Sequence, residues 1–167
     1  DCLQIGGMPL TQLAMRVGQT PFYAYDRHLL TERVASLRGV LPSAVELHYA
    51  IKANPMPALV QHMAGLVNGF DVASLGELHI ALDAGMAPAA ISFAGPGKRP
   101  MELAAAIAAG ITIHLESFNE TETVARLSQE QQRPARVAVR VNADFELKAA
   151  GMKMGGGPKL FGVDAEQ

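Results

Sequence analysis

Short runs of alternating apolar and polar residues recur along the chain, separated by stretches with helical spacing. Five such runs follow one another at a nearly constant interval, at residues 46–51, 69–73, 90–94, 111–116 and 136–142. Regular alternation of strands with helices is typical of βα units, whose strands pair in parallel. The pattern therefore predicts an α/β fold built on a parallel sheet.

Local signals predict where the intervening helices begin and end. Ser74 and Ser117 are each followed three residues later by Glu, which is the pattern of a capping box. The pair Asn54-Pro55 predicts a helix that begins at the proline, because proline favours the first helical position. Glycines that favour helix ends follow the helical stretches, at Gly65, Gly85 and Gly110.

The first 26 residues are predicted to be a lead-in. The segment 10–18 has helical spacing and ends on a glycine, and the run 22–25 predicts a strand that follows Thr20-Pro21. Asp26 stands at an N-cap position, before a stretch with an amphipathic period. We therefore expect residues 1–26 to form a lead-in helix and strand, and residues 27–167 to form the main domain.

Each of the five runs has one bulky apolar face and one small or polar face. In the first run, Tyr49 and Ile51 oppose Ala50 and Lys52, and polar residues of the second face sit late in the later runs, at Asp71, Glu116, Arg140 and Asn142. An open doubly wound sheet has helices on both sides and favours two apolar faces. A (β/α) barrel has helices only outside, and its interior carries chemistry at the carboxyl ends of the strands. The faces favour part of a TIM barrel, about five of its eight βα units, with the open sheet as the alternative.

Composition and charge narrow the function classes. Of 167 residues, 49 % are hydrophobic and 18 % are charged, which suits a folded core, and the net charge of −2 gives no basic surplus for nucleic acid. The longest apolar stretch, 103–113, is too short to span a membrane and is interrupted by Gly110. The single Cys2 excludes an internal disulfide framework and a cysteine-based zinc site, and we expect no metal and a cytoplasmic protein.

Lys52 is the strongest candidate for chemistry. Its position predicts a lysine on the inward face at the end of the first strand, next to a helix start. A lysine that is withdrawn from water without a partner is costly, and such an amine is suited to forming a Schiff base. The alternative is a lysine at the barrel rim that only pairs with a carboxylate.

The other inward polar residues have structural explanations as well. Asp71, Glu116 and Arg140 would satisfy one another, or Lys52, as ion pairs inside the barrel. His48 and His114 share the inward parity, but their spacing matches no metal-binding pattern. The glycine-rich run 151–162 lacks the spacing of a phosphate-binding loop, so a loop at the barrel mouth is the favoured interpretation.

Six segments carry a resemblance to a known family in the same order. They are TPFYAYD (20–26), HYAIKANP (48–55), GFDVASLGEL (69–78), FAGPGK (93–98), VAVRVN (137–142) and KLFGVD (159–164). In these segments the chain resembles the pyridoxal-phosphate decarboxylases of the ornithine, diaminopimelate and arginine class, which have the barrel of the alanine-racemase-like fold. The stretch 145–164 looks most like a bacterial subgroup that is associated with exosortase and exopolysaccharide gene clusters.

The resemblance implies a role for individual residues. Lys52 matches the lysine that holds pyridoxal 5'-phosphate as a Schiff base, and Ala50 matches the small residue that faces the cofactor ring. Asp71 matches the aspartate near the Schiff base, and Arg140 matches the arginine near the phenolic side of the cofactor. Lys98 and Glu77 also lie in family motifs, but the resemblance assigns them no chemistry. The implied reaction is decarboxylation of an amino acid similar to diaminopimelate, ornithine or lysine.

The length of the chain is too short for a complete barrel. A complete barrel has eight strands and about 250 residues, so we expect the chain to be an N-terminal fragment, inactive alone, of a homodimeric enzyme with a C-terminal β domain. The strand expected at 22–25 would belong to that β domain. An amino-acid racemase, a pyridoxal-phosphate carrier without turnover and a cofactor-free Schiff-base aldolase are the alternatives.

Overall fold

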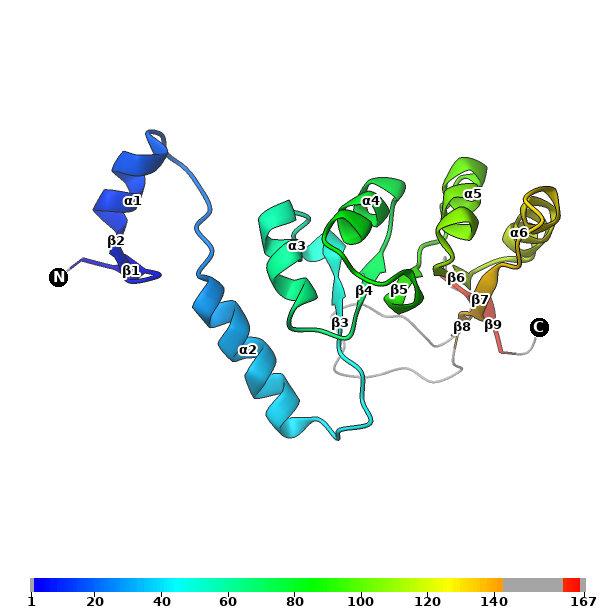
Figure 1. The fold of residues 1–167 in the computed structure, drawn as a ribbon, viewed down its shortest axis with the longest axis horizontal. Helices are drawn as coiled ribbons and strands as arrows, with labels where there is room; N and C mark the ends of the chain where they lie inside the picture. The colour runs from blue at the N-terminus through cyan, green and yellow to red at the C-terminus, as the bar shows by residue number, and fades with distance from the viewer. Residues whose placement is uncertain (1, 143–160, 166–167) are drawn as a thin grey trace. The chain divides into compact units, whose positions relative to one another are not determined.

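A computed structural model describes residues 2–142 and 161–165 of the chain. Its contacts separate the chain into two compact units, Asp1–Glu46 and Leu47–Gln167 (Figure 1). The second unit contains the five predicted strand regions. It is therefore the unit that can carry the predicted barrel chemistry.

The first unit consists of a small hairpin and two helices. Strands β1 (Gln4–Ile5) and β2 (Met8–Pro9) pair antiparallel, and helices α1 (Leu10–Val17) and α2 (Arg27–Val40) follow. As predicted, α1 ends at Gly18, which has a left-handed conformation with φ of 76°. The Asp26 carboxylate caps α2 as predicted, because it accepts the N–H of His28 at 2.8 Å.

The strand predicted at residues 22–25 is not formed. This segment has no regular secondary structure, and Tyr23 is 91 % exposed. A β-strand needs a neighbouring strand for its N–H and C=O groups, and within the described part of the chain no strand pairs with this segment. The apolar pattern alone did not reveal the missing partner.

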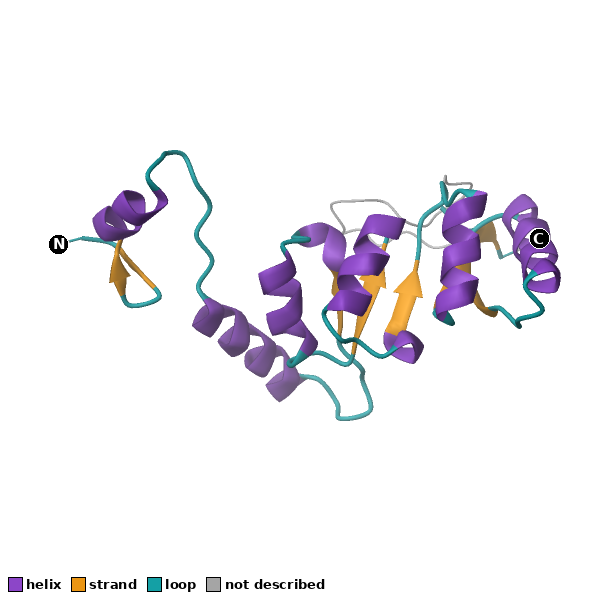
Figure 2. Cartoon of the chain, turned by 45° about the horizontal axis from the view of Figure 1, so that its top comes forward, coloured by secondary structure: helices purple, strands orange, loops and turns teal. Residues whose placement is uncertain are grey.

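The second unit is a five-stranded parallel sheet with helices between the strands. The strands are β3 (His48–Ala50), β4 (Gly69–Val72), β5 (Ile91–Phe93), β6 (Thr112–Leu115) and β7 (Arg136–Val139). The connecting helices are α3 (Pro57–Ala64), α4 (Leu75–Asp83), α5 (Pro100–Ala109) and α6 (Phe118–Glu130), which follow one another along the sheet (Figure 2). Short 3-10 turns, η1 (Ile51–Ala53) and η2 (Pro88–Ala90), precede α3 and β5.

The strand order distinguishes the partial barrel from the open doubly wound sheet. The order in the sheet is β3-β4-β5-β6-β7, the same as in the chain. A doubly wound sheet reverses its strand order at a switch point, whereas a barrel adds each new strand next to the last. The arrangement is therefore part of a TIM-like barrel, as the strand faces predicted.

A further strand pair follows β7 and was not predicted. Strand β8 (Val141–Asn142) pairs in parallel with β9 (Val163–Asp164). Residues 136–142, predicted as one strand, are therefore divided into β7 and β8 at Arg140. Most of the glycine-rich run 151–162 lies outside the described residues, which include only its last two, Phe161 and Gly162.

The hydrophobic core lies on the face of the sheet that the apolar residues were predicted to share. Phe70, Ile91, Phe93 and Ile113 are at most 1 % exposed, together with helix residues such as Leu78, Leu103 and Ile107. The same face of the last strands is different, because Val137, Val139 and Val141 are exposed. Val137 and Val139 belong to β7, the edge of the five-stranded sheet, and Val141 belongs to β8, so the apolar face expected of the last run is not buried among the described residues.

Helix caps follow the predicted residues with small shifts. Helix α3 begins at Pro57 instead of Pro55, because the Asn54 side chain accepts the N–H of Met56 and leaves Pro57 at the first helical position. In α4, Ser74 accepts the N–H of Glu77, but the Glu77 carboxylate accepts the N–H of Ala73, one residue before the cap. The second predicted box has the same displaced form, with Glu120 accepting the N–H of Glu116.

Glu102 joins the starts of two helices. One carboxylate oxygen accepts the Arg99 N–H at 3.0 Å and the Arg99 guanidinium at 3.1 Å, and the other accepts the Leu75 N–H at 3.1 Å. The Arg99 N–H, then the Arg99 guanidinium and the Leu75 N–H, hold the pKa of Glu102 below its ordinary value, against the opposing effect of burial. The ionised form therefore stabilises the fold.

Replacement of Glu102 with glutamine is expected to lower the free energy of unfolding by about 1 kcal/mol at neutral pH, because a neutral amide replaces a charged acceptor. Since the folded-state pKa is depressed, the contribution is present above the ordinary glutamate pKa of 4.5 and is lost as pH falls through the folded value. Urea unfolding of both proteins across this range measures the difference. A gap that persists unchanged at acid pH would contradict this assignment.

Candidate functional site

A pocket of about 490 Å³ opens at the carboxyl ends of the parallel strands. Its wall is formed by residues in or just after β3, β4, β5, β6 and β7 and by one residue before β9. They are Ala50, Lys52, Asp71, Val72, Ala73, Ala94, Gly95, Pro96, Gly97, Lys98, His114, Arg140 and Phe161. In barrels this end of the sheet carries the chemistry. The four residues to which the sequence assigned a role, Ala50, Lys52, Asp71 and Arg140, all line this one pocket.

Lys52 is placed in the turn that follows β3. It lies in η1, not in the strand itself, and its residue is exposed, so the expectation of a buried lysine was wrong. The amine makes no hydrogen bond or ion pair within the described part of the chain. A primary amine that faces a pocket in this way can react with a carbonyl group.

Asp71 is oriented by two neighbours on adjacent strands. One of its carboxylate oxygens accepts the Ser92 hydroxyl and lies 3.4 Å from Nδ1 of His48. The parallel register brings these groups together, since Ala50 pairs with Asp71 and Asp71 pairs with Ser92. The contacts fix a negative charge on the pocket wall, on the face that the alternation predicted.

Arg140 is held by its backbone and by its side chain. Its N–H donates to the Leu115 carbonyl at 3.0 Å, and its own carbonyl accepts the Val163 N–H at 2.9 Å. Its Nη1 lies 3.3 Å from each carboxylate oxygen of Glu116, and its guanidinium lies 4.9 Å from the centre of the Phe161 ring. Glu116 was predicted to pair inside the barrel, and Arg140 is its partner.

Gly162 allows the β9 segment to lie against Arg140. A Cβ at this position would lie 2.7 Å from the Arg140 carbonyl oxygen and 3.1 Å from its Cγ, and the backbone has φ of 75°. Both the close approach and the left-handed conformation favour glycine. In the sequence, Gly162 is one of several glycines in the run 151–162, and nothing there predicts its contact with Arg140.

Sequence reasoning missed a buried ion pair at the pocket wall, where Lys98 is one of the lining residues. Lys98 and Glu120 form a buried ion pair of 2.9 Å, with side chains 1 % and 7 % exposed. Glu120 was predicted only as a capping residue, and Lys98 only as part of a motif. A lysine and a glutamate 22 positions apart give no periodic signal, so only the fold reveals their contact.

One family of known proteins matches most of the chain. The family described as "Pyridoxal-dependent decarboxylase, pyridoxal binding domain" matches residues 27–167. That match includes all four residues with assigned roles. The chain belongs to this family.

Individual decarboxylases match the chain in sequence and in structure. Diaminopimelate decarboxylase of Aquifex aeolicus is 36 % identical over 171 residues, which cover 99 % of the chain and 39 % of the relative. An L-glutamyl-acyl-carrier-protein decarboxylase of Niallia circulans is 36 % identical over 93 % of the chain and 36 % of its own length. The crystal structure of Helicobacter pylori diaminopimelate decarboxylase with L-lysine matches with a TM-score of 0.81 and 29 % identity, over 93 % of the chain and 40 % of that structure. The chain thus spans well under half the length of these relatives.

The pocket fits the cofactor for which the family is named. Pyridoxal phosphate needs a primary amine for attachment, space for a flat ring, and polar groups around that ring. Lys52 supplies the amine, and small side chains leave the space, at Ala50, Ala73, Ala94, Gly95 and Gly97. Asp71 and Arg140 supply opposite charges on the same wall. The chemistry of this donor set fits the group.

The described residues contain neither a metal cluster nor a membrane-spanning helix. No cluster of three or more histidine, cysteine, aspartate or glutamate side chains suited to a metal ion occurs among them. None of the helices in that part of the chain is long and apolar enough to cross a membrane.

Proposed function

We propose that the full-length protein uses pyridoxal phosphate attached to Lys52 to remove a carboxyl group from an amino acid as CO2. The observation that carries the proposal is the meeting of Lys52, Asp71 and Arg140 in one pocket at the carboxyl ends of the strands. Family membership supports the cofactor and the reaction class. Because the chain spans only part of its relatives, the proposal concerns the full-length protein.

Each residue has a role that follows from its contacts. When bound, pyridoxal phosphate withdraws electrons from the amino acid and stabilises the negative charge that remains when CO2 leaves. Lys52 would hold the cofactor through its amine, and because this amine lines the pocket it would also be within the site to move a proton to the reacting carbon. Asp71 keeps a fixed negative charge on the wall, oriented by Ser92 and His48.

Arg140 supplies donors to an anionic oxygen in the pocket. Only its Nη1 has a hydrogen bond to the described residues, to Glu116. A guanidinium has five N–H donors, so the remaining ones are available to a bound group. This agrees with the position near the phenolic oxygen that the family resemblance implies.

The proposal extends to the substrate, the domain division and the assembly of the protein. We propose a substrate similar to diaminopimelate, ornithine or lysine; several relatives are named diaminopimelate decarboxylases, which supports the first of these. We further propose that residues 27–167 form part of the cofactor-binding barrel, that residues 1–26 lead into it, and that the full-length protein is a cytoplasmic homodimer. The association with exosortase and exopolysaccharide systems is a proposal that rests on the sequence at 145–164 alone.

Reduction with borohydride tests the attachment site. The full-length protein, incubated with pyridoxal phosphate and then reduced, is expected to carry the label on the peptide that contains Lys52. Lys98 lines the same pocket but is held in an ion pair, so Lys98-containing peptides serve as the internal control and should stay unlabelled. Absence of label from Lys52, or equal labelling of a Lys52→Ala variant, would refute the proposed role.

A further inference from the structure

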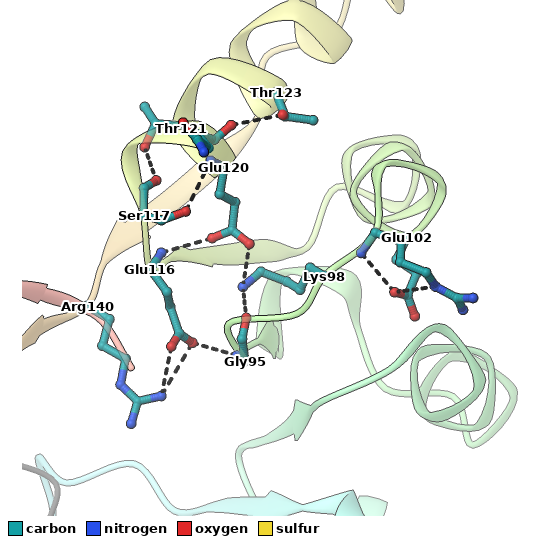
Figure 3. Close-up of polar contacts among 11 residues, drawn as sticks. Gly95, Lys98, Glu102, Glu116, Ser117, Glu120, Thr121, Thr123 and Arg140 are labelled. Atoms are coloured by element: carbon teal, nitrogen blue, oxygen red, sulfur yellow. Dashed lines mark hydrogen bonds and ion pairs between the residues drawn. The ribbon is translucent and has the colours of Figure 1, made fainter. Parts of the chain in front are cut away.

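A continuous polar network borders the pocket and includes three residues of its wall, Gly95, Lys98 and Arg140 (Figure 3). The Glu116 side chain, 1 % exposed, stands at its centre. Its carboxylate accepts the Gly95 N–H at 2.5 Å and faces Nη1 of Arg140 at 3.3 Å. Gly95 and Arg140 both line the pocket. One buried carboxylate therefore contacts two residues of the pocket wall, one in the loop after β5 and one after β7.

A second ion pair supports Glu116 from the side away from Arg140. One oxygen of Glu120 accepts the Glu116 N–H at 2.9 Å, and the other binds the Lys98 amine at 2.9 Å. Lys98 also donates to the Gly95 carbonyl. Both backbone polar groups of Gly95 are therefore held by the network, the N–H by Glu116 and the carbonyl by Lys98.

The charges of the network balance. Two carboxylates, Glu116 and Glu120, face two cations, Lys98 and Arg140. Buried charges are tolerated when they are paired and hydrogen-bonded, and no buried side-chain nitrogen or oxygen in the described part of the chain lacks a partner. Removal of the Glu116 charge alone would leave the guanidinium of Arg140 without its counter-charge at the pocket wall.

We propose that Glu116 is a positioning residue, supported by the Lys98–Glu120 pair, that fixes the Arg140 guanidinium and the Gly95 backbone in the geometry that binds pyridoxal phosphate. This inference rests on the proposed function. Glu116 does not line the pocket itself, so it acts through Arg140 and Gly95. Its carboxylate uses one Arg140 nitrogen, so the other donors of the guanidinium remain available to a bound group.

The test measures cofactor affinity in the full-length apoprotein by absorbance titration with pyridoxal phosphate. Glu116→Gln keeps an acceptor for the Gly95 N–H but removes the charge opposite Arg140. The dissociation constant is expected to rise about tenfold, because a charged hydrogen bond is replaced by a weaker neutral one. Glu130→Gln, which removes a carboxylate from the exposed pair with Arg126 on α6, is the matched control and should leave the affinity unchanged.

A double-mutant cycle separates positioning from a general structural effect. If Glu116 acts through Arg140, Glu116→Gln should change the dissociation constant by less than about twofold in an Arg140→Gln background, since coupled effects are not additive. The same tenfold change in both backgrounds would overturn the proposal. So would an unchanged dissociation constant in the single variant, even if its melting temperature fell.

A second variant keeps the proposal testable if Glu116→Gln does not fold. The double replacement Lys98→Met with Glu120→Gln removes both charges of the supporting pair together, which leaves neither charge unpaired. It removes the donor to the Gly95 carbonyl, so the dissociation constant should rise about threefold. Wild-type affinity in this variant would overturn the proposal.

The failure of this inference differs from the failure of the proposed function. If the unmodified protein binds no pyridoxal phosphate and Lys52 stays unlabelled, the proposed function fails and the inference fails with it. If the unmodified protein binds the cofactor and is labelled on Lys52 while the variants bind equally well, only the inference is overturned.

Discussion

Replacement of Lys52 with alanine is expected to lower the rate of CO2 release by the full-length protein by about 10³-fold, the scale of a lost general acid or base. The expectation follows from the position of the amine, which faces the pocket and makes no hydrogen bond or ion pair within the described residues. The variant loses both the attachment of the cofactor and the group that carries a proton to the product. The measurement is kcat for the best substrate among meso-diaminopimelate, L-ornithine, L-lysine and L-arginine.

Two further variants separate these roles from a general change in charge. Lys52→Arg keeps a positive charge but offers no amine that can form the covalent bond, and it should be as impaired as Lys52→Ala. His62→Ala, on helix α3, changes a residue that does not line the pocket and should leave kcat within about twofold. A Lys52→Ala enzyme with more than about a tenth of the original kcat would contradict the assigned role.

Much of the fold was predictable because its signals are local. The alternation of apolar and polar residues gave the five strand regions and the face that becomes the core, since a one-residue change of register would expose that face. Caps at Asp26, Ser74 and Ser117 follow from side chains that bind backbone N–H groups a few residues away. The start of α3 was misplaced by two residues because Asn54 satisfies Met56 in a turn before the helix begins.

The errors occurred where distant or missing partners decide the structure. Residues 22–25 have a strand-like composition but no paired strand in the described residues. Val137 and Val139 are exposed on the edge strand β7, and Val141 is exposed on β8. Lys52 is exposed because η1 carries it beyond the end of β3. A sequence pattern describes only a preference for burial, and the surrounding elements decide whether the residue is in fact buried.

The candidate site was predicted in its main residues but not in its support. Lys52, Asp71 and Arg140 line one pocket, as strand parity on the inward face predicts, and the roles that the family resemblance implies for them stay predictions. Lys98 and Glu120 were not found, because the loop after β5 and the first turn of α6 meet only in three dimensions. Contacts of this kind have no spacing in the sequence that could predict them.

The buried Lys98–Glu120 pair leads to the second large effect, on stability. Lys98→Met is expected to lower the free energy of unfolding by about 3 kcal/mol, because it leaves the Glu120 carboxylate buried without its counter-charge. The loss should show as a lower midpoint in urea unfolding, followed by far-ultraviolet circular dichroism of the full-length apoprotein. Methionine has a length similar to that of the lysine stem, so a cavity contributes little to the difference.

Two comparisons decide whether the uncompensated charge is the cause. Lys98→Met combined with Glu120→Gln removes both charges and should recover most of the loss, to within about 1 kcal/mol of the original protein. Arg126→Met removes the cation from an exposed pair with Glu130, at 2.7 Å, and should cost less than about 1 kcal/mol, because water screens that pair. If the single and the paired replacement at Lys98 are equally destabilising, the lost packing of the lysine stem accounts for the effect and the charge does not.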